Sequence, residues 1–111
     1  MTTYNIDSYA VRRWSSRPTT NRSPGVAVAG IFLYQGSTYR GYAYFFADGT
    51  DLADPVITSQ TIHVHFSLSE LDSILQMLRE ERPVYLYEFG STNAGLMTGR
   101  EPTGEEEGRN G

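Results

Sequence analysis

The stretch TIHVHFSLSELDSIL, residues 61–75, changes its apolar periodicity from that of a strand to that of a helix within a few residues. Ile62, Val64 and Phe66 alternate with polar residues, which is typical of a half-buried strand. After Phe66 the apolar residues recur at helical spacing. The helical stripe consists of Leu68, Leu71, Ile74, Leu75 and Leu78. A strand that leads directly into a helix predicts an α+β fold.

The ends of this helix are marked in the sequence. Ser67 and Glu70 have the spacing of a capping box, in which the serine begins the helix and the glutamate returns a hydrogen bond to it. Pro83 marks the end, because the residue before a proline is displaced from helical geometry. We therefore expect one main helix at about residues 67–82.

A β-hairpin precedes this unit. The apolar runs VAVAGIFLY (26–34) and YRGYAYFFA (39–47) are separated by a short turn in which Gly36 supplies the positive φ that a tight hairpin needs. This turn predicts that Tyr34 pairs with Tyr39 and that Phe32 then pairs with Gly41, so that large residues oppose small ones. It also predicts that Phe32 faces the core.

The remaining segments complete the predicted fold. Further strands are expected at 4–14, 84–89 and about 95–98. The order predicts a curled antiparallel sheet of five or six strands with the helix against it, either as an OB-like barrel or as an open sheet. We expect a single domain over residues 1–99 and an acidic, glycine-rich tail over 100–111. The predicted core contains Val28, Phe32, Phe45, Ile62, Val64, Leu71, Ile74, Leu75 and Leu78.

Length and composition restrict the class of protein. A chain of 111 residues with 20% charged residues suits one folded domain with a modest core. No apolar run approaches the roughly 20 residues of a membrane span. The first residues lack the basic start and apolar core of a secretory signal, so we expect a cytoplasmic protein without membrane contact. The absence of cysteine excludes disulfides, thiol catalysis and cysteine-bound zinc.

Metal binding and catalysis are weakly indicated. His63 and His65 lie on one side of a strand, and Glu70 follows at a distance that suits a third metal ligand. Glu70 is better explained by the capping box, and a metal needs three or four ligands with ordered supporting groups. No nucleophile elbow or glycine-rich phosphate loop is present. We therefore expect no metal, no cofactor and no enzymatic activity.

The outer side of the sheet is the candidate binding face. The residues assigned to it are Arg40, Tyr42, Tyr44, His63, His65, Tyr85 and Tyr87. Tyrosine is enriched at protein interfaces because it buries area and keeps a polar tip. The same rings beside arginine are suited to stacking nucleic-acid bases. A partly buried second core in a closed barrel is the third explanation of this pattern.

Charge distinguishes two functions for that face. Arg12, Arg13 and Arg17 are candidates for phosphate contacts, but the net charge of −4 and the pI of about 5.0 weigh against nucleic acid. We therefore predict a non-catalytic protein-binding or structural module that self-associates through its aromatic face as a homodimer or larger ring. Its further protein partner is not identified by the sequence. The alternative is a single-stranded nucleic-acid-binding protein that uses the tyrosine and arginine face.

Overall fold

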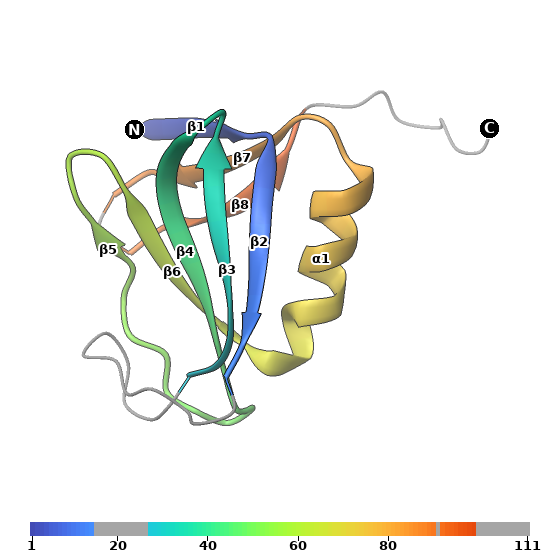
Figure 1. Ribbon diagram of the computed structural model, residues 1–111. Helices are drawn as coiled ribbons and strands as arrows, with labels where there is room; N and C mark the ends of the chain where they lie inside the picture. The colour runs from blue at the N-terminus through green and yellow to red at the C-terminus, as the bar shows by residue number, and fades with distance from the viewer. Residues whose placement is uncertain (15–26, 91, 100–111) are drawn as a thin grey trace, which may run out of the picture.

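The computed structural model describes residues 1–14, 27–90 and 92–99 (Figure 1). The strands are β1 (Thr2–Ile6), β2 (Ser8–Arg13), β3 (Ala27–Gln35), β4 (Thr38–Phe46), β5 (Val56–Ile57), β6 (Ile62–Ser67), β7 (Val84–Glu88) and β8 (Ala94–Thr98). A 3₁₀ turn (Leu68–Glu70) leads into the helix α1 (Leu71–Glu80). The predicted α+β class with one main helix is confirmed. The tail assigned to 100–111 lies outside the described residues.

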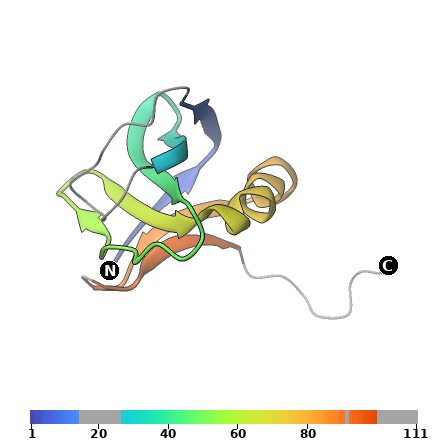
Figure 2. The same ribbon diagram turned by 90° about the horizontal axis from the view of Figure 1, so that it is seen from below.

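The strands form two sheets. One has three strands in the order β1-β7-β8, and the other has five in the order β2-β3-β4-β6-β5. Figures 1 and 2 show the smaller sheet and α1 on the same side of the larger one. The sheets are not closed into a barrel, so the OB-like alternative does not describe this fold. The chain instead encloses its core between two open sheets and a helix.

The predicted first strand, 4–14, is divided between the two sheets. β1 pairs with β7 and β2 pairs with β3, so the chain changes sheet at Asp7. The Asp7 N–H donates to the Tyr34 carbonyl at 3.1 Å, and its Oδ1 accepts the Gly36 N–H at 2.8 Å. These bonds hold the crossing point against the β3–β4 turn, a long-range contact that local periodicity does not indicate.

The prediction of a fully antiparallel arrangement is wrong at one strand pair. β4 and β6 are parallel, with Gly41 opposite Ile62 and Phe45 opposite Phe66. Parallel neighbours need a connection of about a dozen residues or more. Residues 47–61 supply that length, and β5 within them pairs antiparallel with β6. The loop therefore returns the chain to the start of β4 before β6 begins.

The hairpin register differs from the expected one by a β-bulge. Tyr34 pairs with Tyr39 as predicted, but the next pair is Leu33 with Gly41. Arg40 is the extra residue in β4, and such an insertion shifts the pairing by one position. The shift exchanges the two sides of β3. Phe32, predicted in the core, is therefore half-buried on the opposite side of the sheet.

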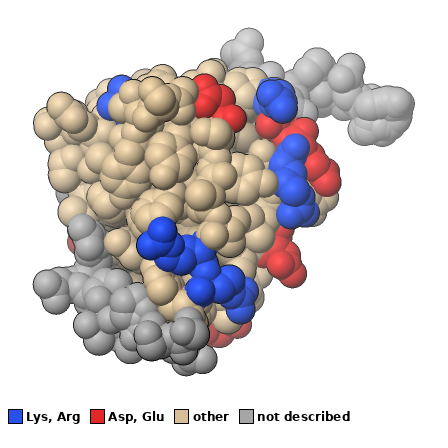
Figure 3. Space-filling model, in the orientation of Figure 1, with Lys and Arg blue, Asp and Glu red and all other residues tan. Residues whose placement is uncertain are grey.

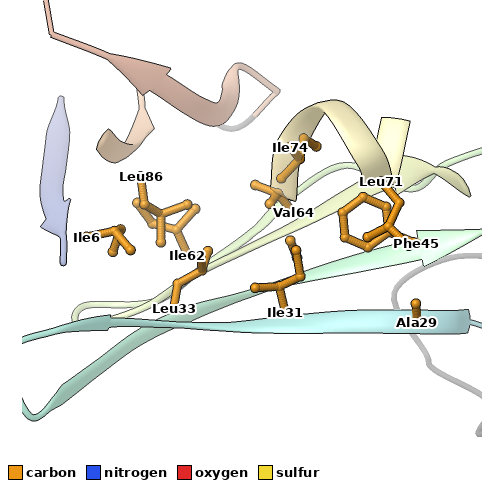
Figure 4. Close-up of a cluster of buried hydrophobic side chains, with 11 residues drawn as sticks. Ile6, Ala29, Ile31, Leu33, Phe45, Ile62, Val64, Leu71, Ile74 and Leu86 are labelled. Atoms are coloured by element: carbon orange, nitrogen blue, oxygen red, sulfur yellow. The ribbon is translucent and has the colours of Figure 1, made fainter. Parts of the chain in front are cut away.

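The core lies between the two sheets and α1 (Figure 4). Its buried members are Ile6, Ala29, Ile31, Leu33, Ala43, Phe45, Ile62, Val64, Leu71, Ile74 and Leu86. Leu75 and Leu78 pack against this cluster as expected, whereas Val28 is buried outside it. Leu33, Phe45 and Leu86 have no exposed surface. Full burial of such a side chain stabilises the fold by about 1.5–3 kcal/mol.

The helix begins differently from the prediction. Ser67 has extended geometry and forms no side-chain capping bond, so the predicted capping box with Glu70 is wrong. The Asp48 Oδ1 instead accepts the N–H of Ser69 at 3.0 Å. A carboxylate from the loop after β4 thus satisfies a donor of the first turn. No helix within the described residues has the length and apolar character that crossing a bilayer requires.

Candidate interaction face

Aromatic side chains gather on the side of the five-stranded sheet that points away from the core. In β4 the residues alternate, so that Ala43 and Phe45 enter the core while Tyr42 and Tyr44 lie opposite. The parallel pairing places His63 beside Tyr42 on the same sheet. We call the following set the aromatic face: Trp14, Phe32, Tyr34, Tyr39, Tyr42, Tyr44, Phe46, His63 and His65.

Tyr42 is the centre of the ring contacts. Its ring centroid lies 4.4 Å from that of Tyr44 with an angle of 7° between the planes, and 4.2 Å from that of Phe32 at 70°. Trp14, just after β2, is stacked at 6.3 Å. Offset-stacked and edge-to-face pairs are the favoured aromatic geometries and contribute about 0.5–1.5 kcal/mol each beyond area burial. The rings therefore form a packed layer instead of separate projecting side chains.

A glycine makes this layer possible. Gly30 of β3 lies beneath the ring of Tyr42, and a Cβ at this position would overlap Cε1 of that ring. The absence of a side chain lets the ring lie flat against the backbone. The β-bulge also adds rings to this layer. It places Phe32 opposite Tyr42, and it brings Tyr39 onto the same side of the sheet.

The two histidines belong to the same layer. Their rings lie 6.4 Å (His63) and 5.9 Å (His65) from the ring of Tyr44, at angles of 21° and 19°. The Nδ1 of His65 lies 3.1 Å from the Ala53 carbonyl oxygen, and a donated bond there fixes the ring orientation. Within the described ranges, no group of three His, Asp or Glu side chains is placed to hold a metal ion. The arrangement suits packing of the imidazoles against tyrosine.

Burial varies along the aromatic face. Tyr42 is 5% exposed and Phe46 has no exposed surface, whereas Tyr34 and Tyr44 are half-buried and Tyr39 is 36% exposed. The accessible part therefore lies toward the turn that joins β3 and β4. In Figure 3, which views this side of the molecule, uncharged side chains cover most of the face and basic side chains lie across its lower part.

A cation, Arg12, lies over the aromatic face. The guanidinium carbon of Arg12 is 4.7 Å from the centroid of the Phe32 ring, a cation–π contact. Burial raises the pKa of the Tyr42 phenol, and the positive charge of Arg12 partly opposes that rise. The hydroxyl of Tyr42 is buried and has no hydrogen-bond partner in the part of the chain that the structure describes.

Several residues predicted for the binding face lie elsewhere. Arg40 bonds Oε1 of Gln35 at 3.0 Å, and its guanidinium lies 4.2 Å from the ring of Tyr4 in the other sheet. Tyr85 and Tyr87 are on β7, in the three-stranded sheet, where the ring of Tyr87 lies 4.9 Å from that of Phe89. These side chains do not join the aromatic face. For Tyr85 and Tyr87 the reason is that the chain forms two sheets, while the prediction placed all strands in one; for Arg40 it is the β-bulge in β4.

The structure places one of the three arginine candidates beside a ring of the aromatic face: Arg12 lies over Phe32. Arg13 follows it as the exposed last residue of β2. Arg17 lies outside the described residues.

Sequence reasoning missed several members of the aromatic face. Strict alternation along β4 places Arg40 on the same side as Tyr42. Because of the bulge, Tyr39 occupies that side instead. Phe32 and Tyr34 were assigned to the core side for the same reason. Trp14 falls at the end of β2, where the strand prediction carried no information about its side.

No protein-family model matches this chain, and neither the curated proteins nor the solved structures contain a significant match to it.

Proposed function

We propose that this protein is a non-catalytic protein-binding module of the cytoplasm that self-associates through its aromatic face. The observation that carries the proposal is the largely uncharged aromatic surface over β3 and β4, with Tyr39 exposed and Phe32 and Tyr34 half-buried beside it. The cores of protein interfaces are depleted of charge and enriched in tyrosine and phenylalanine. Rings already packed against one another also lose little side-chain freedom on binding.

A second copy of the chain is the partner that this surface fits best. Most oligomers of identical chains pair one patch with itself about a two-fold axis. Two copies of a largely uncharged face can meet in this way without like-charge repulsion at the centre, even though each chain has a net charge of −4. Arg12 lies over the Phe32 ring, so its guanidinium would lie within or beside such a contact.

Single-stranded nucleic-acid binding is the second candidate. It is favoured by one arrangement, the guanidinium of Arg12 over Phe32 with Trp14 stacked on the neighbouring Tyr42. Stacked rings beside an arginine suit exposed bases. The weak point is electrostatic, because a chain with a net charge of −4 offers little overall attraction to a phosphate backbone.

Sedimentation velocity over a range of protein concentrations tests the proposal. We expect the unmodified chain to form a dimer or larger ring in place of a 12.4 kDa particle. Tyr39→Asp introduces a charge at the accessible end of the face and should weaken association at least tenfold, because a buried unpaired carboxylate is costly. Phe89→Asp is the matched control, since Phe89 is 46% exposed on the other sheet. A monomer at every concentration, or equal losses in both variants, would contradict self-association through this face.

Fluorescence anisotropy with short single-stranded DNA and RNA tests the second candidate. Phosphate-dependent binding must weaken steeply as salt is raised. Binding that falls with salt and is reduced by Arg12→Gln, but not by Arg13→Gln, would favour nucleic acid over self-association. An absence of binding at low salt would eliminate this candidate.

A further inference from the structure

A cavity of about 840 Å³ lies between the end of α1 and the point where the chain passes from β1 in one sheet to β2 in the other. Small-molecule sites in proteins usually have volumes of about 300–1,000 Å³. No residue of the aromatic face lines this cavity, so an inference about it is independent of the proposed function.

The cavity has an apolar wall. Tyr9, Leu78 and Pro83 line it and are each half-buried, and the buried side chains of Ile6 and Val84 lie behind them. The divergence of the two sheets at Asp7 explains this opening, because β1 and β2 turn toward different partners there. An apolar ligand body that contacts Tyr9, Leu78 and Pro83 would remove their remaining apolar surface from water.

The polar groups of the cavity differ in whether they already form a hydrogen bond within the fold. Asp7 is bound to the Gly36 N–H at 2.8 Å, so its carboxylate also serves the β3–β4 turn. Arg79, in the last turn of α1, and Arg82 both line the cavity and are exposed. A guanidinium presents several donors in a planar fork that matches a carboxylate. The cavity therefore combines an apolar wall with two arginine donors at its rim.

The charges in the lining also limit the ligand. Arg79 and Arg82 are balanced formally by Asp7 and Glu81, so the cavity has no strong positive field. A dianion or polyanion would approach two carboxylates as well as two guanidinium groups. A single carboxylate can bond the arginines while its apolar body keeps it against the wall.

We infer that this cavity binds a small aromatic or aliphatic monocarboxylate. The carboxylate lies at Arg79 and Arg82, and the apolar body lies against Tyr9, Leu78 and Pro83. The ligand thus bridges the β1–β2 crossing and the end of α1.

Backbone amide NMR with a matched set of probes tests this inference. The probes are 2-naphthoate, 2-naphthalenemethanol, 2-naphthylmethylammonium and 2-naphthyl phosphate, which share one ring system and differ in charge. We expect 2-naphthoate to bind most tightly and to shift the amides of residues 5–9 and those of 78–84 other than Pro83 together. The unliganded spectra of each variant report whether it is folded.

Two variants separate this site from general surface binding. Arg79→Gln combined with Arg82→Gln should weaken 2-naphthoate about tenfold and leave 2-naphthalenemethanol unchanged, because only the carboxylate loses its charged donors. Arg13→Gln removes an exposed arginine that does not line the cavity and should change neither affinity. The inference is overturned if 2-naphthoate gives no shifts at millimolar concentration, if the ammonium or phosphate probe binds as tightly, or if the shifts map to the aromatic face.

Discussion

Tyr42 combines burial with an unused polar group. It is 5% exposed, its ring is packed between Phe32 and Tyr44, and its hydroxyl has no hydrogen-bond partner among the described residues. A buried polar group without a partner costs about 1–3 kcal/mol. The ring therefore stabilises this part of the fold, and the hydroxyl opposes that effect.

Removal of that hydroxyl should stabilise the protein. We expect Tyr42→Phe to raise the free energy of unfolding by about 1 kcal/mol, as measured by urea denaturation. Tyr85→Phe, at a half-buried position in the other sheet, serves as the control and should be nearly neutral. A loss of stability in Tyr42→Phe alone would mean that the hydroxyl has a partner.

The same residue predicts an alkaline pH dependence. Burial raises the pKa of Tyr42 above the ordinary value of 10.0, so the unfolded chain loses this proton at a lower pH than the folded chain. The corresponding stability is fully present below pH 10 and is lost as the pH rises through the folded-state pKa. Ultraviolet titration of tyrosinate should show one late-titrating phenol that is missing in Tyr42→Phe. Identical titrations of the two proteins would contradict the burial of this phenol.

Gly41 tests the close approach of β4 to its neighbour β6. A Cβ at this position would overlap the Ile62 carbonyl oxygen and meet Cδ2 of Leu86 at 2.8 Å, so the backbone of β6 would have to move. We expect Gly41→Ala to lower the free energy of unfolding by about 3 kcal/mol. Gly36→Ala has open space but a φ of 61°, and it should cost only about 1 kcal/mol. Equal costs in urea denaturation would show that β4 and β6 do not approach so closely.

At the scale of elements, the first turn of α1 depends on a residue distant in sequence. Asp48 accepts the Ser69 N–H, while Ser67 and Glu70 form no capping box. Local sequence gave the position of the helix correctly because its apolar spacing is local. It gave the wrong cap because the carboxylate arrives from the loop after β4, which depends on the tertiary fold.

Substitutions at the cap distinguish the two arrangements. Asp48→Ala should lower the free energy of unfolding by about 1 kcal/mol, since a first-turn donor loses its acceptor. Ser67→Ala should have little effect, and Asp51→Ala in the same loop is the matched acidic control. If thermal denaturation instead shows the larger loss in Ser67→Ala, the capping box is present in solution.

The hairpin shows where sequence reasoning fails within an element. The pairing of Tyr34 with Tyr39 follows from the turn and was predictable, whereas the bulge at Arg40 lies beyond the turn and reverses the sides of β3. Arg40 makes its contacts with Gln35 and with Tyr4 of the other sheet. Those contacts require the sheet pairing to be known, so a period-two pattern cannot reveal them.

At the scale of the whole molecule, the three-stranded sheet and α1 cover one side of β3 and β4 and leave the aromatic face on the other. The α+β class, the helix and the outward position of Tyr44 and His63 could be predicted, because each follows from local periodicity. The division into two sheets could not, since it depends on the change of direction at Asp7. That division removed Tyr85 and Tyr87 from the candidate face, and the bulge within the β3–β4 hairpin separately brought in Phe32.

Isotope-filtered NMR on a mixture of labelled and unlabelled chains tests self-association through the aromatic face most directly. The measurement detects contacts between protons of different protomers only. We predict intermolecular contacts from the rings of Phe32, Tyr34 and Tyr39, which form the accessible end of the face. Intermolecular contacts confined to Tyr87 and Phe89 on the other sheet, or none at concentrations where all chains should be paired, would contradict the account.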